Sequence, residues 1–311
     1  MKSWLAFLLG LVLGAGPAAA DPPLKVGTWK TAQTIQPYFY EQFLNGEAAV
    51  QVFPFTNPAD QKTALLAGSL DMCGTTIAHA IHSAAQGQPV VVVAALCHKC
   101  SALVVRKAST IATAGELKGL KIGYVPGTMH EILLREVLTR HRLNPEQDVR
   151  LIRVDFFDMG LALARGGIDA FLSGEHFPAL AVHEGYGRIL DYPYYDDTVG
   201  TINAGMLVTR QILEAHPKRV LQLVQAHARA TEFLNRHPDQ WLARAAAFGT
   251  EPEVLEAAAA NMELAWEMDE AFVQRAKALG ARMQALRMIE RQPDYDRLFD
   301  LQFVKRVKAE R

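Results

Sequence analysis

Residues 64–107 read ALLAGSLDMCGTTIAHAIHSAAQGQPVVVVAALCHKCSALVVRK, and this stretch decides the fold that we predict. Within it, the small, polar and thiol residues 73–76 lead into an alanine-rich segment with helical spacing. The apolar run 90–96, β-branched at its start, is typical of a buried parallel strand. That run stops at the turn Cys-His-Lys-Cys, residues 97–100, and a second extended run follows at 102–106. Because strand ends of this kind converge on a ligand crevice in open α/β sheets, the stretch predicts a binding site.

An alternation of strands and helices precedes this stretch. We expect strands at 24–27 and 50–55, and helices at 36–44 and 60–67, the second of which ends at Gly68. This β-α-β-α-β order predicts a parallel sheet with right-handed crossovers.

The alternation restarts after Arg106 and predicts a second α/β unit. Its expected strands are 121–125, 149–154, 167–172, 188–190 and 202–209, and its expected helices are 113–117, 129–141, 159–165 and 179–184. From Gln211 onward only helical spacing remains, which predicts helices at 217–235, 239–247, 251–264, 269–288 and 298–307. We interpret the Ala and Leu positions of these last helices as a packing surface.

Residues 1–20 are typical of a secretory signal peptide. Lys2 provides the positive charge, residues 4–13 provide the apolar core, and alanines at 18–20 precede Asp21 as in a cleavage site. A core of this length is too short to span a bilayer, so we do not expect a membrane anchor. We expect the mature chain, residues 21–311, to be exported and soluble, with no later segment long enough to cross a membrane.

The composition of the chain argues against two classes of partner. The formal net charge is −1 and the basic residues are not clustered, so we expect neither nucleic acid nor a membrane surface to bind. The sequence contains three cysteines. In an oxidising compartment an odd number leaves at least one thiol unpaired or in another role.

Several motifs carry a resemblance to a known family. They are the stretch 64–107, residues 117–123 (LKGLKIG), residues 126–128 (PGT), residues 164–170 (ARGGIDA), Glu175 with Pro178, and residues 235–239 (NRHPD). Through these motifs, over nearly all of the mature chain, the sequence resembles periplasmic solute-binding proteins of the nitrate, sulfonate and taurine group of ABC importers. That group also includes proteins that bind thiamine-pyrimidine precursors.

The resemblance implies an α/β fold of the class II type, with two lobes, two parallel-rich sheets and a helical C-terminal tail packed on lobe one. Lobe one would comprise residues 21–104 and 205–311, lobe two residues 105–204, and crossover strands at 102–106 and 203–209 would join them. The implied function is that of a monomeric, non-enzymatic periplasmic protein without a cofactor. It would capture a small organic solute or weak anion by hinge closure and present it to an inner-membrane permease.

The residues that we expect at the ligand cleft follow strands or begin helices. After the first strand come Thr28 and Trp29, whose indole either stacks on a flat solute or only packs against its lobe. Helix starts either offer backbone N–H groups to an anion or are simply capped by their threonines, at Gly74, Thr75, Thr76, Gly127, Thr128 and Met129.

Three further candidates lie at strand ends and at a crossover. Glu175 either contacts the ligand or forms a hinge salt bridge, and as a carboxylate it favours an amine, a ring N–H or a metal over a dianion. Asn203 either exchanges hydrogen bonds with the ligand or belongs to the hinge structure. Ser101 opens the extended run after the cysteine-containing turn.

The turn at 97–100 departs from the small polar residues that the family usually carries there, and it leaves several alternatives open. Cys97 and Cys100 form a disulfide, as in many exported proteins, or their thiols line the pocket. Alternatively a soft metal binds to Cys73, Cys97 and Cys100, joined by Met129, His130 or Glu175. A thiol redox protein on the same scaffold is the remaining alternative, because C-x-x-C spacing can lower the pKa of a thiol.

Overall fold

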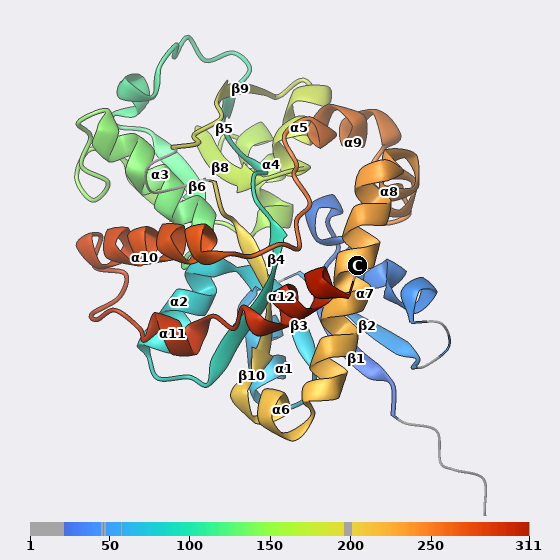
Figure 1. Ribbon diagram of the computed structural model, residues 1–311. Coiled ribbons are helices and arrows are strands. Elements are labelled where there is room, and N and C mark those ends of the chain that lie inside the picture. The colour runs from blue at the N-terminus through green and yellow to red at the C-terminus, as the bar shows by residue number, and fades with distance from the viewer. Residues whose placement is uncertain (1–21, 45, 47, 57, 196–200, 311) are drawn as a thin grey trace, which may run out of the picture.

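Two α/β lobes make up the molecule (Figure 1). The structure is a computed structural model that describes residues 22–44, 46, 48–56, 58–195 and 201–310, so the expected signal peptide at 1–20 lies outside the described residues. None of the helices in these ranges combines the length and the apolar character that a membrane span requires.

The first lobe is built on a five-stranded sheet with the strand order β2-β1-β3-β10-β4. Its strands are β1 (Leu24–Trp29), β2 (Val50–Phe55), β3 (Met72–Thr76), β4 (Val90–Cys97) and β10 (Ala204–Thr209). β1 pairs in parallel with β2 and β3, as the β-α-β-α-β order predicts. β10, in contrast, runs antiparallel to both β3 and β4.

The prediction that residues 90–96 form a parallel strand is wrong in its pairing. β4 lies at the edge of the sheet, where its ladder partner is the antiparallel strand β10. Every residue of β4 is nevertheless buried, because the C-terminal tail covers it. Phe299 forms a bridge with Val92, and Leu264 forms one with Cys97. The apolar run therefore indicated burial correctly but not the direction of the neighbouring strand.

The second lobe repeats this pattern of pairing with the strand order β7-β6-β8-β5-β9. Its strands are β5 (Ser101–Arg106), β6 (Lys121–Tyr124), β7 (Arg150–Arg153), β8 (Ala170–Gly174) and β9 (Gly187–Asp191). β6 is parallel to β7 and β8, and β5 is antiparallel to β8 and β9. The predicted two-lobe α/β architecture is confirmed, with mixed sheets in place of parallel-rich ones.

The chain passes between the two sheets twice. It leaves the first sheet after Cys97 and enters the second at Ser101, and it returns between Asp191 and Ala204. The run 102–106, expected as a crossover strand, is therefore a strand of the second sheet. The lobe limits that we expect, 21–104 with 205–311 and 105–204, remain a prediction.

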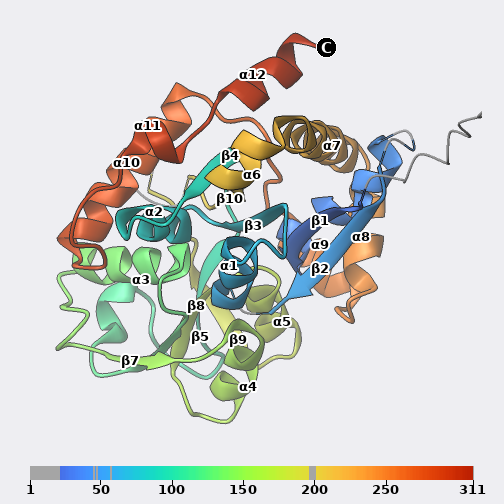
Figure 2. The same cartoon turned by 90° about the horizontal axis from the view of Figure 1, so that it is seen from below.

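Short helices flank both sheets (Figures 1 and 2). The first lobe has the 3-10 helices η1 (Ala32–Thr34) and η2 (Gln36–Phe43) and the α-helices α1 (Pro58–Leu66) and α2 (Ile77–Ala85). The second lobe has η3 (Ala114–Leu117), α3 (Met129–Arg140), η4 (Phe156–Asp158), α4 (Met159–Ala164) and α5 (Phe177–His183). The segment expected as a helix at 36–44 is thus a 3-10 helix, which apolar spacing alone does not distinguish from an α-helix.

The C-terminal tail is helical, as predicted, but two expected helices are interrupted. Its helices are α6 (Arg210–Ala215), α7 (Pro217–Arg236), α8 (Pro238–Ala246), α9 (Pro252–Ala259), α10 (Glu270–Ala285), α11 (Tyr295–Leu298) and α12 (Gln302–Ala309). The helix expected at 251–264 ends early because the chain then runs along β4, where Ala265 N donates to Leu96 O (3.0 Å). The helix expected at 298–307 is split where Asp300 N donates to Val92 O (3.0 Å). In both places the free backbone groups of an edge strand are satisfied in preference to a continuous helix.

Most of the tail covers the first lobe, as expected. α7 packs on η2, and α12 packs on α7 and β4. α9 packs instead against α5 of the second lobe, and Figure 1 shows these two helices side by side. The tail therefore contacts both lobes.

A buried polar network in the first lobe joins α7, η2 and β4. His227 is fully buried, with Nε2 2.7 Å from Ala95 O and Nδ1 2.9 Å from Tyr40 OH. A carbonyl oxygen only accepts hydrogen bonds, so Nε2 carries the proton and Nδ1 accepts from the tyrosine. Burial lowers the pKa of His227 to about 4, so the ring is neutral in the native protein.

We predict that His227 makes the free energy of unfolding fall as the pH drops from 8 to 5.5. Below the unfolded pKa of about 6.5, the unfolded chain binds a proton at His227 that the native protein does not bind, so acid favours unfolding. His227→Gln should reduce this loss by about 1.4 kcal/mol, measured by urea titration of both proteins at both pH values.

The comparison of wild type and variant isolates His227 from other groups. Burial also lowers the pKa of His79, His130 and His176, which act in the same direction, and raises the pKa of Glu175, which acts in the opposite direction. These contributions cancel in the difference between the two proteins. An unchanged pH dependence in the variant would contradict a neutral, buried His227.

Candidate functional site

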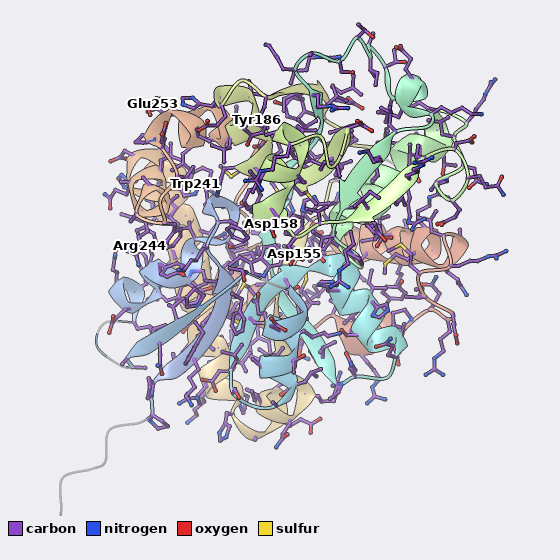
Figure 3. All side chains as sticks on the ribbon, turned by 180° about the vertical axis from the view of Figure 1, so that it is seen from behind. Asp155, Asp158, Tyr186, Trp241, Arg244 and Glu253 are labelled. Carbon is purple, nitrogen blue, oxygen red and sulfur yellow. The ribbon has the colours of Figure 1, made fainter. Side chains whose placement is uncertain are left out.

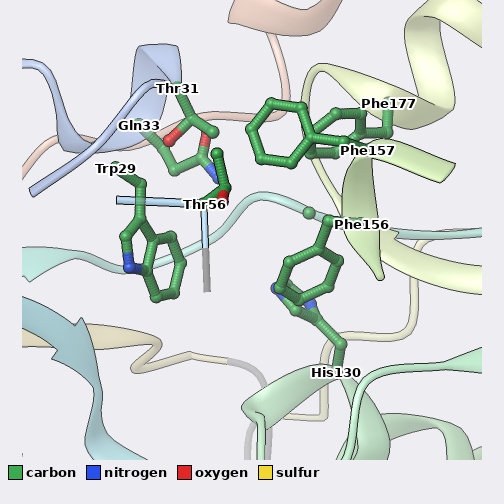
Figure 4. Close-up of a pocket in the computed structure, with 9 residues that line it drawn as sticks. Trp29, Thr31, Gln33, Thr56, His130, Phe156, Phe157 and Phe177 are labelled. Carbon is green, nitrogen blue, oxygen red and sulfur yellow. The ribbon is translucent and has the colours of Figure 1, made fainter. Parts of the chain in front are cut away.

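A pocket lies between the two lobes (Figure 4). The first lobe lines it with Trp29, Thr31, Gln33 and Thr56, and the second lobe lines it with His130, Phe156, Phe157, Gly174 and Phe177. The cavity between these residues has a volume of about 10 Å³, about the room for one water molecule, so the side chains of the two lobes nearly fill the cleft in this conformation. The position of the pocket between the lobes is nevertheless typical of a small-molecule site.

Four aromatic side chains form most of the pocket wall. The rings of Trp29 and Phe156 meet across the cleft with their centroids 6.3 Å apart. Phe156 and Phe177 are nearly parallel, at an interplanar angle of 10° and a centroid distance of 6.2 Å. Phe157 stands edge-on to Phe177 and is partly exposed, at the mouth of the pocket. Flat apolar faces of this kind bind a flat solute through stacking and burial.

The first-lobe wall is held in place by the C-terminal tail. Trp29 is the last residue of β1, and η1 follows it with Gln33 at its centre. Trp241 of α8, labelled in Figure 3, donates its indole N–H to Ala32 O in η1 (2.8 Å). Since η1 is only three residues long, this bond holds the backbone that carries Gln33.

The polar groups of the pocket are uncharged. His130, in the first turn of α3, places Nδ1 3.0 Å from Ser101 Oγ, and burial lowers the pKa of His130 to about 3. Gln33 is 3% exposed, and its Oε1 has no hydrogen-bond partner among the residues that the structure describes. A buried polar atom without a partner is costly, so this amide is free to bind a ligand.

None of the described residues that line the pocket carries a charge. At its edges, Lys30 follows Trp29, Asp155 precedes η4 and Asp158 ends it, and all three are exposed. Figure 3 shows the two aspartates near the line where the lobes meet. Two carboxylates against one ammonium favour a neutral or cationic solute over an anion.

Glu175 follows Gly174 but does not line the pocket. Its carboxylate accepts hydrogen bonds from Asn261 Nδ2 (2.9 Å) and from Ala179 N (3.2 Å) in the first turn of α5. Burial raises the pKa of Glu175 to about 7. No salt bridge of Glu175 occurs within the described ranges, and its partner from the other lobe is the amide of Asn261.

The start of α3 is filled by the protein's own side chains. Thr128 Oγ1 accepts from Glu131 N (3.4 Å), and the Glu131 carboxylate accepts from Gly127 N (2.7 Å), an arrangement that resembles a capping box but uses the N–H of the residue before the N-cap. Met129 is fully buried. Gly127, Thr128 and Met129, expected to contact an anion, all lie outside the pocket lining.

We expected residues 74–76 to lie at the start of a helix, but residues 73–76 belong to the strand β3. The backbone of Gly74 and Thr75 pairs with β10. Thr76 caps α2 by accepting from His79 N (3.3 Å), and Thr28 donates to Thr34 O (2.6 Å). These residues have structural partners, and their predicted contact with a ligand remains a prediction.

The three cysteines are buried free thiols, and only two of them lie together. Cys97 lies close enough to Cys100 to raise the pKa of the Cys100 thiol, and Asn203 Nδ2 donates to Cys100 Sγ (3.3 Å). Cys73 lies beside Gln61 in the core, where burial raises its pKa to about 12. In the part of the chain that the structure describes, no three His, Cys, Asp or Glu side chains are grouped to hold a metal ion. The soft-metal alternative therefore has no support in the structure.

Of the residues predicted to contact the ligand, only Trp29 lines the pocket. Gln33 and the three phenylalanines were not predicted from the sequence, and His130 was predicted only as a possible metal ligand. Phe156 and Phe157 follow the strand expected at 149–154, and Phe177 follows the one expected at 167–172. The rule that strand ends carry binding residues would have found them. No sequence signal distinguished Gln33.

The two lobes with a pocket between them define the class of molecule, that of the periplasmic binding protein fold. The chain belongs to the NMT1/THI5-like family, whose model matches residues 38–241. The family resemblance inferred from the sequence motifs is confirmed.

Solved structures share this fold over almost the whole chain. One is the ligand-binding component of an ABC-type import system from Staphylococcus aureus with zinc bound (TM-score 0.80, 18% identity, 91% of this chain and 98% of that one). Another is the alkanesulfonate-binding protein SsuA from Xanthomonas axonopodis pv. citri bound to MOPS (TM-score 0.80, 19% identity, 91% and 100%). The desulfurization enzyme DSZB also shares it (TM-score 0.71, 14% identity, 93% and 99%). At these identities the likeness shows the fold alone.

One curated relative matches part of the chain. The nitrate import ATP-binding protein NrtC of Synechococcus elongatus is 36% identical over 101 residues. The match covers 32% of this chain and 13% of the relative, so the chain spans only a small part of that protein's length.

We predict that no thiol of the reduced, native protein reacts rapidly with Ellman's reagent. All three cysteines are buried, and burial raises the pKa of Cys73 and, together with the neighbouring Cys97 thiol, that of Cys100. The reaction requires a thiolate that the reagent can reach. Denaturation should make all three thiols reactive, and rapid reaction of one thiol in the native protein would contradict their placement.

Proposed function

We propose that this protein is the solute-binding component of an ABC importer and that it works in the periplasm after export. It captures a small, flat, uncharged organic solute between its lobes and presents it to a permease in the inner membrane. The proposal rests above all on the pocket, whose mainly aromatic wall comes from both lobes and contains no charged side chain among the described residues.

Closure of the lobes by a hinge is supported by polar contacts around the pocket. Asn261 binds Glu175, Thr250 Oγ1 lies 3.1 Å from His176 Nε2, and His183 Nε2 lies 3.1 Å from a carboxylate oxygen of Glu251. Each contact joins the tail, expected in lobe one, to the expected lobe two. These contacts separate when the lobes open, and a monomer of this kind binds and releases its solute by that motion.

The lining supports an uncharged solute over an anion. An anion is bound by cationic side chains or by free N–H groups at a helix start. The two helices that contribute to the lining, α3 and α5, have their first turns occupied by the carboxylates of Glu131 and Glu175. The family resemblance implies either a small organic solute or a weak anion. These contacts favour the small organic solute.

A binding role without turnover is supported by the chemistry of the wall. The described lining contains no thiol, serine or carboxylate, and its one imidazole, His130, is a weak base because burial lowers its pKa to about 3. Cys97 and Cys100 lie at the crossover, and Ser101 contacts His130 from outside the lining. No observation favours the thiol redox alternative.

Native mass spectrometry of protein purified from the periplasm without denaturation tests this proposal. We expect a bound compound that is lost on denaturation and that is aromatic and uncharged in solution. A bound sulfonate or inorganic anion would contradict the proposed solute class. A melting temperature that no uncharged ring compound raises would contradict the proposed function.

We predict that Trp29→Ala weakens binding of the identified solute by about tenfold or more, because the variant loses one aromatic face of the pocket. Isothermal titration calorimetry measures the loss. Phe303→Ala, which removes a partly buried ring of α12 outside the pocket, is the control and should bind like the wild type. Equal affinity of Trp29→Ala and wild type would show that the solute binds elsewhere.

A further inference from the structure

Two neutral side chains, one from each lobe, face the same point of the pocket. A β-carbon built on Gly174 would lie 3.0 Å from His130 Nε2 and 3.2 Å from Gln33 Nε2. Gly174 is the last residue of β8, and a side chain at this position would crowd both nitrogens, so the glycine lets the two side chains approach the same part of the strand. Figure 4 shows His130 and Gln33 reaching into the pocket from opposite sides.

The proton of His130 is placed by its contact on the other ring nitrogen. Ser101 Oγ is fully buried, and within the described ranges its one hydrogen-bond partner is His130 Nδ1, at 3.0 Å. A buried hydroxyl whose proton has no acceptor is costly, so Ser101 donates to Nδ1. Burial lowers the pKa of His130 to about 3, so the neutral ring carries its single proton on Nε2, toward Gly174.

The amide of Gln33 is available for a ligand. The side chain is 3% exposed, and among the described residues neither its donor Nε2 nor its acceptor Oε1 has a hydrogen-bond partner. Trp241 holds the short helix η1 in place through Ala32, so the amide is presented from a fixed backbone. A buried polar group that the protein does not itself satisfy marks a place for a polar group of the ligand.

We propose that Gln33 and His130 form a two-donor subsite for a hydrogen-bond acceptor of the solute, a carbonyl oxygen or an unprotonated ring nitrogen. Ser101 is the positioning residue that fixes the tautomer of His130. This inference rests on the proposed function, since it names the group by which the pocket selects among flat solutes. Because each lobe supplies one donor, an acceptor held between them links binding to lobe closure.

The competing explanation is that His130 only packs in the wall. Its ring stands perpendicular to that of Phe156, with centroids 5.3 Å apart, and a phenylalanine would make the same contact. Packing alone requires no particular tautomer and gives no preference for solutes with an acceptor. The two explanations are therefore separable by experiment.

Two probes of equal shape test the subsite, acetophenone and α-methylstyrene, which differ by a carbonyl oxygen in place of a methylene group. We expect wild type to bind acetophenone about three- to tenfold more tightly, as one hydrogen bond allows. Dissociation constants from ligand-observed NMR give this ratio. In His130→Phe and in Gln33→Leu the preference should fall while both probes still bind. A preference that survives in both variants overturns the proposal.

A second measurement requires no ligand. ¹⁵N NMR of the imidazole should show His130 protonated on Nε2 in the wild type and a mixture of tautomers in Ser101→Ala, which should also lose part of the acetophenone preference. Ser83→Ala is the matched control, because Ser83 is another buried serine, and its hydroxyl has no partner among the residues described. The control should change neither quantity. A wild-type ring protonated on Nδ1 overturns the proposal.

The two measurements separate the failure of the subsite from the failure of the proposed function. If neither probe binds the wild type, the proposed class of solute fails. The NMR measurement of the His130 tautomer then still decides whether His130 Nε2 carries the proton that it would donate. If both probes bind without preference for the carbonyl, the subsite fails and the proposed function stands.

Discussion

The contact of Trp29 with Phe156 across the cleft is the interaction on which the rest of the structure depends. It joins the end of β1 in the first lobe to η4 in the second, with ring centroids 6.3 Å apart. The two sheets bring these segments together, because the lining residues lie at the ends of strands or just after them: Trp29 ends β1, Phe156 follows β7 and Gly174 ends β8. The solute class follows from this contact, since a wall of apolar rings stabilises what is flat and uncharged.

The titratable side chains around the pocket shift toward their neutral forms. A charged group without a partner is strongly destabilising in an apolar site, so buried titratable groups shift their pKa toward the neutral form. Burial lowers the pKa of His130 to about 3, so its ring is neutral, and raises the pKa of Glu175 to about 7, so about half of these side chains are protonated at neutral pH. Glu175 is bound by the amide of Asn261 and by the backbone of α5, which leaves the helix start closed to a foreign anion.

The sequence was sufficient for the architecture and insufficient for most of the site. Alternating apolar runs and helical segments predicted two α/β lobes, and the position of Trp29 after the first strand predicted its place in the pocket. The pairing of β4 could not be predicted, because its partner β10 and its cover, the tail around Phe299, come from distant parts of the chain. Gln33 could not be predicted either, because the short helix that carries it, η1, is held in place by a bond from the distant Trp241.

The central claim is that the pocket binds uncharged, flat solutes and rejects anions of the same shape. Benzamide and benzoate test it directly, because they share size and planarity and differ in charge. Isothermal titration calorimetry at pH 7.5 should show benzamide binding at least about tenfold more tightly than benzoate, a difference of about 1.4 kcal/mol. Tighter binding of benzoate would contradict the account, and would mean that a cation outside the described lining reaches the solute.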